Sequence, residues 1–269
     1  MSAPTSPGLL VEDHGPVRVL TLNRPERRNA VDLDDRATLL DALVLAERES
    51  RAIVLTGAAP MFCSGGDIGS MTTDPEISRR RLELVNAIAR QMVTSATPIV
   101  AAVEGGAFGL GLALACACDL VVASESARFA ASFAKIGLAP DTGLLWSLPQ
   151  RVGPALTRRM VLTACTLDAP AALACGLVDE LVDDGTALDR ALVLAGELAT
   201  KSAPALAGVR RILAQPDQTL EGILTAEAEV QMSLFSTPEF AEGRAAFFER
   251  RPADFAGAAA SPVSVEVLS

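Results

Sequence analysis

The fold class is inferred from the pattern of strands and helices in residues 98–123 of a 269-residue chain, PIVAAVEGGAFGLGLALACACDLVVA. Its first part, Pro98–Val103, is a short apolar run that predicts a buried strand. A glycine-rich loop over Glu104–Gly111 leads into a Leu/Ala run typical of a helix, and Asp119–Ala123 predicts the next strand. This strand–helix–strand order predicts a mostly parallel sheet flanked by helices, and hence an α/β fold.

The same alternation occupies the chain before this segment. The expected strands are Leu9–Glu12, Val17–Asn23 and Arg51–Gly57, and the expected helices are Asp34–Glu49 and Pro75–Thr94. After about Leu144 the sequence favours helices separated by prolines, with Leu177–Val182 as a further short apolar run. We therefore expect a flexible arm (1–8), an α/β core (9–200), a helical C-terminal region (201–256) and a tail (257–269).

Composition excludes several classes of function. Lys and Arg number 23 against 33 Asp and Glu, which gives a net charge of −10, and a field of this sign repels nucleic acid. The chain has no Tyr, and its one His, His14, precedes Gly15-Pro16 in a turn-like segment. Catalysis by a His-based triad or an active-site Tyr is therefore not expected, and acid–base chemistry falls to carboxylates.

The cysteines and the N-terminus indicate a reducing compartment. Five cysteines are an odd number for a disulfide framework, and the Cys116-x-Cys118 pair lies in an apolar segment without a second ligand pair elsewhere. We expect no metal and no redox cofactor. The start of the chain lacks the basic and apolar regions of a signal peptide, and no apolar run is long enough to cross a membrane. A cytoplasmic location is the expectation.

Two glycine loops are candidate binding elements. Gly105, Gly109 and Gly111 match the G-x-x-x-G-x-G spacing of dinucleotide loops, but the loop lies far from the first strand, and neither loop contains G-K-[ST]. Such loops also aim backbone N–H groups at a developing oxyanion where they open a helix. Phe62–Ile68 (FCSGGDI) has the same design. Together the two loops can present one N–H each to the oxygen of a thioester that becomes an enolate.

Five segments in collinear order resemble the crotonase superfamily, the enoyl-CoA hydratases and isomerases. They are LNRPERRNAV (22–31), VLTGAAPMFCSGGDI (54–68), PIVAAVEGGAFGLGLALACACD (98–119), residues 129–148 and EGRAAFFERRPADF (242–255). The resemblance spans about residues 9–256. It implies a ββα-spiral core, a C-terminal helical trimerisation region, and a trimer or a dimer of trimers that acts on acyl-CoA thioesters. Coenzyme A would then be part of the substrate, with no separate cofactor.

The resemblance also assigns site residues. Gly66 and Leu110 match the two backbone N–H donors of the oxyanion site; Gly or Ala is usual at the second position, so the Leu110 side chain narrows the pocket. The residues implied to bind substrate or CoA are Arg27, Arg28, Ser64, Gly66, Asp67, Ile68, Leu110, Phe133, Phe247 and Arg250. We expect Asp67 to act as a structural cap rather than as a catalyst.

The carboxylates separate the reactions of this family. Hydratases use two glutamates, at whose matching positions this chain has Ala113 and Phe133. One acid remains in the neighbourhood, Asp141, within KIGLAPDTGLLWSL (135–148), which resembles the isomerases typified by those of the phenylacetate pathway, where an Asp at this position shuttles a proton. Aryl-CoA dehalogenases carry a nucleophilic Asp at the same position. A structural alternative is that Asp141 is a helix N-cap.

The leading hypothesis is an enoyl-CoA isomerase that moves a double bond between the β,γ and α,β positions, with Asp141 as proton shuttle. One alternative is an enoyl-CoA hydratase with an atypical active site. Others are a thioester hydrolase or dehalogenase with Asp141 as nucleophile, and a binder of acyl-CoA without catalysis. If Asp141 has no part in the reaction, Cys63 or Glu104 becomes the next candidate.

Overall fold

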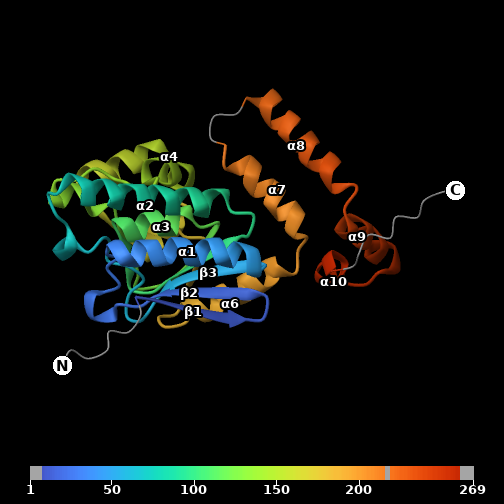
Figure 1. Cartoon of the computed structure of the whole chain (residues 1–269), viewed down its shortest axis with the longest axis horizontal. Coiled ribbons are helices and arrows are strands. Elements are labelled where there is room, and N and C mark those ends of the chain that lie inside the picture. The colour runs from blue at the N-terminus through green and yellow to red at the C-terminus, as the bar shows by residue number, and fades with distance from the viewer. Residues whose placement is uncertain (1–7, 216–218, 261–269) are drawn as a thin grey trace.

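The computed structural model describes residues 8–215 and 219–260. Its strands are β1 (Leu9–His14), β2 (Val17–Leu22), β3 (Ala52–Gly57), β4 (Ile99–Val103), β5 (Gly106–Phe108), β6 (Leu120–Ser124), β7 (Arg128–Ala130), β8 (Thr166–Asp168) and β9 (Glu180–Val182). Its α-helices are α1 (Leu33–Glu49), α2 (Pro75–Thr94), α3 (Leu110–Ala117), α4 (Leu144–Thr163), α5 (Ala169–Ala174), α6 (Ala187–Ala199), α7 (Ala203–Leu213), α8 (Leu220–Leu234), α9 (Pro238–Glu249) and α10 (Phe255–Ala260). Short 3₁₀ helices are η1 (Pro25–Arg27), η2 (Ile68–Ser70) and η3 (Ser132–Ile136). Figure 1 shows a core of sheets and helices with a helical extension at the C-terminal end.

The main sheet has the order β1-β2-β3-β4-β6-β9. Strands β1 and β2 form an antiparallel hairpin, and every later pair in the sheet is parallel. Helices α1, α2 and α3 supply the crossovers that parallel neighbours require. The mostly parallel sheet predicted from the sequence is confirmed, and the helix predicted over Pro75–Thr94 has the same bounds in the structure.

Helices cover both faces of this sheet, which explains why its central strands β3, β4 and β6 are apolar without alternation. On one face α6 presents an i, i+4 stripe of buried alanines, Ala187, Ala191, Ala195 and Ala199, to β2, β3, β4 and β6. On the other face α1, α2, α3 and α4 enclose the larger core, and the two layers lie on opposite sides of the sheet in Figure 1. Small alanine side chains let α6 lie close to the strands.

A second, three-stranded sheet was not predicted. It consists of β5, β7 and β8, with β5 and β7 parallel and β8 antiparallel to β7. The segment expected to be only a glycine loop contains β5, because Gly106 pairs with Arg128. A β-carbon on Gly106 would lie 2.3 Å from the Arg128 carbonyl oxygen, so the pairing requires glycine there.

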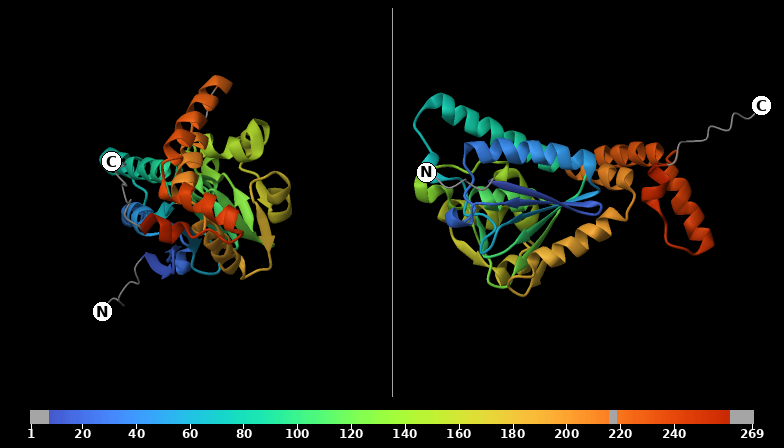
Figure 2. Two further views of the ribbon diagram at one scale, coloured as in Figure 1. Left: turned by 90° about the vertical axis from the view of Figure 1, so that its right-hand side faces the viewer. Right: turned by 60° about the horizontal axis from the view of Figure 1, so that its bottom comes forward.

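The helices after α6 extend away from the sheets (Figures 1 and 2). Helix α7 is attached to the core by Arg210, whose guanidinium pairs with Asp119 at 2.8 Å and also donates to the carbonyl oxygens of Met92 and Ser95. Residues 257–260 were expected to belong to a tail (257–269), but they are the last four residues of helix α10, so this part of the prediction is wrong. Residues 261–269 of that tail and residues 1–7 of the expected arm lie outside the described residues. No helix within the described ranges is long and apolar enough to span a membrane.

Candidate active site

The two glycine loops predicted to cooperate lie side by side. The N–H of Phe108 donates to the Cys63 carbonyl oxygen at 3.0 Å, and the N–H of Cys63 donates to the Gly106 carbonyl oxygen at 3.2 Å. The start of α3 presses on the first loop so closely that a β-carbon on Gly111 would lie 2.5 Å from the Cys63 carbonyl oxygen. Glycine at this position therefore lets the two loops meet.

This contact brings the two predicted oxyanion donors to one pocket. Gly66 follows Gly65, whose φ of 118° turns the chain, and Leu110 is the first residue of α3. The N-cap residue of α3, Gly109, has no side chain with which to cap the helix. Within residues 8–215 and 219–260, neither the Gly66 nor the Leu110 N–H donates a hydrogen bond. Both remain available to an oxygen, and the α3 dipole favours negative charge there.

The pocket at this point has a volume of about 220 Å³. Its lining contains six of the residues predicted from the sequence: Ser64, Gly66, Ile68, Leu110, Phe133 and Asp141. It also contains residues that were not predicted: Arg36, Gly65, Met71, Gly109, Ser132, Lys135, Ile136 and Leu138. Asp141 is the only carboxylate among these lining residues, all of which the structure describes.

The Asp141 side chain does not cap a helix. It accepts a hydrogen bond at 2.9 Å from the Thr142 hydroxyl, while the N-cap of α4 is Gly143 and has no side-chain cap. Thr142 is 1% exposed and has a φ of 55°, a strained conformation for a β-branched residue. The alternative prediction that Asp141 is a helix N-cap is therefore wrong. The turn that carries this carboxylate stores backbone strain.

The other catalytic candidates lie elsewhere or are inert. Ala113, which stands where the resemblance places a hydratase glutamate, has no ionisable group, is buried within α3 and does not line the pocket. Glu104 accepts from the N–H groups of Gly185 and Ala187 at 3.1 and 3.0 Å, so it supports the start of α6 on the far face. Burial raises the pKa of the Cys63 thiol to about 12, which removes it as a nucleophile near neutral pH.

Among the lining residues that were not predicted, Arg36 is a buried cation. It lies on α1 in one buried stripe with Leu39, Leu43 and Ala46, is 2% exposed, and lines the pocket. Its Nε and Nη1 atoms are buried and have no hydrogen-bond partner in the part of the chain that the structure describes. Burial, and then the nearby charge of Arg81, lowers the pKa of Arg36 to about 10, although the charge of Asp141 opposes this shift.

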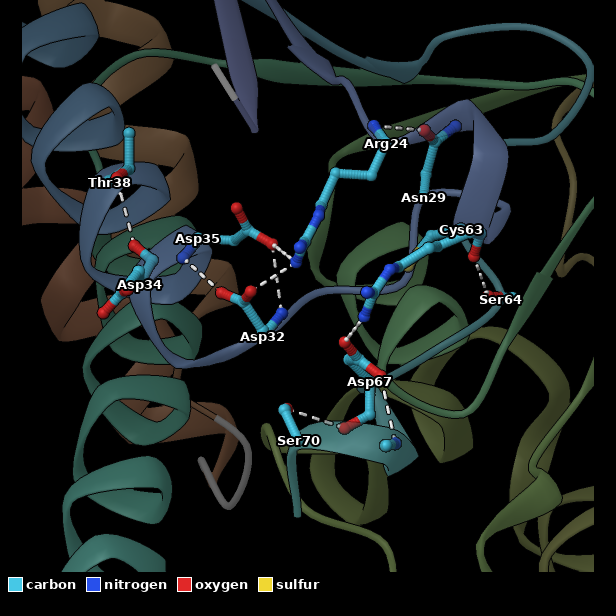
Figure 3. Close-up of polar contacts among 12 residues, drawn as sticks. Arg24, Asn29, Asp32, Asp34, Asp35, Thr38, Cys63, Ser64, Asp67 and Ser70 are labelled. Carbon is cyan, nitrogen blue, oxygen red and sulfur yellow. Dashed lines mark hydrogen bonds and ion pairs between the residues drawn. The ribbon is translucent and has the colours of Figure 1, made fainter. Parts of the chain in front are cut away.

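The residues implied to hold CoA at the first loop lie together. The Ser64 N–H donates to the Arg28 carbonyl oxygen at 2.9 Å, and the Arg27 guanidinium pairs with Asp67 at 2.7 Å. Asp67 also accepts from the Gly69 N–H at 3.0 Å and so caps η2, as predicted (Figure 3). Arg27 and Arg28 are exposed, and their backbone contacts Ser64, which lines the pocket.

A partly buried network of polar side chains lies between this loop and α1. Asp32 and Asp35 form a capping box at the start of α1, and Arg24 pairs with both carboxylates (Figure 3). Burial alone would raise the pKa of Asp32, but its hydrogen bonds from the Asp35 N–H and from Arg24 outweigh this effect and lower it. The Asn29 side chain accepts from the Arg24 N–H at 2.9 Å and donates to the Ala58 carbonyl oxygen at 2.7 Å. The Asn29 side chain also donates to the carbonyl oxygen of Met61, the residue before the first loop, so the network links α1, the end of β3 and the start of that loop.

Phe247 and Arg250 are not brought to this pocket within one chain. Phe247 is 78% exposed on α9 and lines a separate cavity of about 550 Å³ among the C-terminal helices, and Arg250 ends α9. Their predicted contact with CoA stays a prediction. Groups of three or more His, Cys, Asp or Glu that could hold a metal are absent from the described ranges, 8–215 and 219–260.

Comparisons with known proteins identify the family to which the chain belongs. The family model of the enoyl-CoA hydratases/isomerases matches residues 12–258. The chain is 38% identical over 241 residues to a probable enoyl-CoA hydratase of Rhodobacter capsulatus, covering 89% of this chain and 94% of the relative. It is 34% identical to the 1,2-epoxyphenylacetyl-CoA isomerase of Escherichia coli, with 90% and 95% covered. The crystal structure of an enoyl-CoA hydratase from Polaromonas sp. JS666 is similar with a TM-score of 0.87 at 32% identity, covering 91% of this chain and 98% of that one. This chain belongs to the enoyl-CoA hydratase/isomerase family.

Proposed function

We propose that the protein is an enoyl-CoA isomerase that moves a double bond between the β,γ and α,β positions of an acyl-CoA. The observation that carries this proposal is the acid content of the pocket. Asp141 is the single carboxylate of the lining, and the two positions that hold glutamates in the hydratases hold Ala113 and Phe133. A reaction that returns the proton it removes needs one such group, whereas hydration also needs activation of water.

The oxyanion site supplies the charge stabilisation. Gly66 and Leu110 both line the pocket and their N–H groups have no acceptor in the described chain, which supports a role for both as donors to the thioester oxygen. As the α-proton leaves, negative charge moves onto that oxygen and the two hydrogen bonds strengthen. Loss of one such donor raises a barrier by roughly 3–4 kcal/mol.

Asp141 then transfers the proton from one carbon to the other. Its carboxylate removes a proton from the α-carbon of a 3-enoyl-CoA, which gives a dienolate, and the resulting carboxylic acid returns the proton to the γ-carbon. The Thr142 hydroxyl bonded to Asp141 fixes the orientation of the carboxyl group. Because nothing is oxidised and no water is added, the reaction needs neither a metal nor a redox cofactor.

We further propose assembly as a trimer or a dimer of trimers. Large apolar side chains remain exposed along the C-terminal helices, namely Leu213, Leu220, Leu224, Met232, Phe235 and Phe247. In α8 only Val230 is buried. So much exposed apolar surface favours association with further copies of the chain. Light scattering at micromolar concentration tests this, and a monomer would contradict it.

Hydration is the second candidate, and the relatives favour it. The Rhodobacter capsulatus relative is named a probable enoyl-CoA hydratase and the Polaromonas structure an enoyl-CoA hydratase, whereas the Escherichia coli relative is named an isomerase. Hydration by this chain would require Asp141 both to activate water and to manage the α-proton. Because a single carboxylate would have to perform both tasks, we rank hydration below isomerisation.

A panel of 2-enoyl-CoA and 3-enoyl-CoA thioesters of several lengths separates the two. An isomerase interconverts the 2-enoyl and 3-enoyl forms faster than it forms any 3-hydroxyacyl-CoA. Hydration at a comparable or higher rate would overturn the isomerase proposal. A covalent acyl adduct on Asp141 would identify a nucleophilic enzyme instead, and tight binding without turnover of any enoyl isomer would identify a binder.

A further inference from the structure

Arg36 has no task in the proposed isomerisation, yet it lies in the acyl pocket. Its guanidinium reaches the residue that carries the first oxyanion donor, because a β-carbon on Gly66 would lie 3.0 Å from Arg36 Nη2. Its Nε and Nη1 atoms lack both solvent and a hydrogen-bond partner within residues 8–215 and 219–260. A buried guanidinium without a partner is costly, since buried charges in proteins are normally paired.

The two anions that act on Arg36, Asp141 and Asp32, only partly offset its burial and the second cation beside it, so its pKa is still lowered. Arg81 on the adjacent helix α2 is a second cation, with its Nη2 bonded to the Ser70 carbonyl oxygen at 2.8 Å and its Nη1 buried without a partner among the described residues. Lys135 adds a cation at the exposed rim of the pocket. Asp141 is the only anion of the lining, so the pocket keeps an excess of positive charge.

We propose that Arg36 binds a carboxylate in the acyl part of the substrate, so that the enzyme selects short dicarboxylic acyl-CoA thioesters. This inference rests on the proposed function only in that the pocket holds the acyl group of a CoA thioester. A carboxylate is the partner that matches the planar fork of a guanidinium and neutralises its charge. Because Nη2 lies beside Gly66, the carboxylate belongs a few carbons from the thioester and not at the end of a long chain.

Equilibrium binding of unreactive, saturated thioesters tests the proposal without relying on turnover. Succinyl-CoA is compared with butyryl-CoA, and glutaryl-CoA with valeryl-CoA, so that each pair differs by a terminal carboxylate in place of a methyl group. We expect the wild-type protein to bind at least one dicarboxylic member about ten-fold more tightly than its matched partner. A ratio below two in both pairs would overturn the proposal.

Arg36→Met removes the charge while keeping an unbranched apolar side chain. We expect the ratio within each pair to fall to about one, with affinity for butyryl-CoA and valeryl-CoA changed less than three-fold. Arg79→Met is the matched control, since it makes the same substitution at an exposed arginine of α2 that does not line the pocket, and it should keep the preference. An equal loss of affinity for both members of a pair would show that Arg36 acts on the thioester itself, which contradicts the proposal.

A melting curve provides a second readout. If Arg36 is present to bind a ligand, Arg36→Met should raise the Tm of the free protein by a few degrees, because an apolar side chain replaces an unpaired buried charge. If the variant instead fails to fold, Arg36 is required for the structure, and the wild-type ratios then decide the proposal alone.

Failure of this inference is distinguishable from failure of the proposed function. A dicarboxylic preference without isomerase turnover would refute the isomerase and leave the role of Arg36 intact. Isomerase turnover without a preference would do the reverse. Failure of all four thioesters to bind would overturn both.

Discussion

Two arginines are buried to a similar degree in this protein, and their surroundings differ completely. Arg210, on α7, is 8% exposed and donates to Asp119 and to the carbonyl oxygens of Met92 and Ser95. Arg36, on α1, is 2% exposed, and its buried Nε and Nη1 atoms find no partner within the described chain. The protein itself supplies hydrogen-bond acceptors to the Arg210 guanidinium, but its described residues supply none to these two atoms of Arg36.

The difference separates a structural region from a binding region. Buried polar groups that serve the fold are satisfied by hydrogen bonds, so Arg210 marks the junction where α7 joins the core. A buried cation without partners destabilises the free protein, and such a group is expected where a ligand completes the arrangement. Variants at the junction should therefore change stability, and variants at the pocket should change binding or turnover.

The largest effect is expected from a matched pair of carboxylate variants. Asp141→Asn keeps the shape of the side chain but removes the proton shuttle, so isomerase kcat should fall by about 10²–10⁴. Acyl-CoA affinity and Tm should stay close to wild type, because Asp141 caps no helix. Steady-state kinetics with a 3-enoyl-CoA, together with a melting curve, measures both.

Asp119→Asn is the control from the junction. It removes the charge facing Arg210 and should lower stability by about 2 kcal/mol while leaving kcat within about two-fold. Unchanged turnover in Asp141→Asn would remove Asp141 from the mechanism and erase the distinction between the two regions.

The next largest effect is expected from Arg210→Met. The substitution strips the partners from the carbonyl oxygens of Met92 and Ser95 and leaves Asp119 without its cation, which should cost about 3 kcal/mol. Calorimetry should show a Tm lower by about 6–10 °C. A Tm that rises in this variant, as expected for Arg36→Met, would show that the two buried arginines are equivalent.

A smaller effect is expected from Arg27→Ala at the first glycine loop. The Arg27–Asp67 pair is half exposed on the arginine side, with 53% of that side chain accessible, so its loss should cost only about 0.5 kcal/mol. If Arg27 contacts CoA, KM should rise about 5–10-fold with kcat unchanged. Arg79→Ala, which removes an exposed arginine of α2, is the control and should change neither constant.

The smallest effect is expected from alkylation of the native protein at pH 8. Burial raises the pKa values of Cys63 and Cys116 to about 12 and that of Cys118 further, so these three thiols stay protonated and unreactive. Iodoacetamide should modify only Cys165 and Cys175, which are partly exposed, and turnover should not change. Peptide mapping by mass spectrometry measures this, and modification of Cys63 with loss of activity would contradict it.

The core of the fold was predictable because its local signals agree. The apolar run Pro98–Val103 predicted a strand that forms at Ile99–Val103, and the helix predicted over Pro75–Thr94 forms with Asp74 as its N-cap. The small sheet was not predictable, because its three-residue strands carry no periodicity and β5 begins with a glycine. Its existence depends on pairing across the chain, for example between Gly106 and Arg128.

The site was predictable where backbone groups carry the chemistry and less so where side chains do. Gly66 and Leu110 follow from glycine loops that precede helices. A helix cap at Asp141 was a fair alternative from the sequence, and only the left-handed backbone of Thr142 and Gly143 shows that α4 begins later. The spacing of Arg36 places it on the buried face of the helix, three and seven residues before Leu39 and Leu43. A charged residue at such a position interrupts the apolar pattern, so the periodicity does not predict that it is buried.

The strained turn at Thr142 has a consequence for the adaptation of this protein. A β-branched residue held at φ 55° carries a backbone strain that glycine in the same conformation would not carry. Selection for heat resistance alone would therefore favour glycine at this position, and glycine would also delete the hydroxyl that orients Asp141. At this residue, relief of backbone strain would come with loss of the side chain that orients the catalytic carboxylate. A thermostable descendant that keeps its activity should therefore gain its stability elsewhere in the chain.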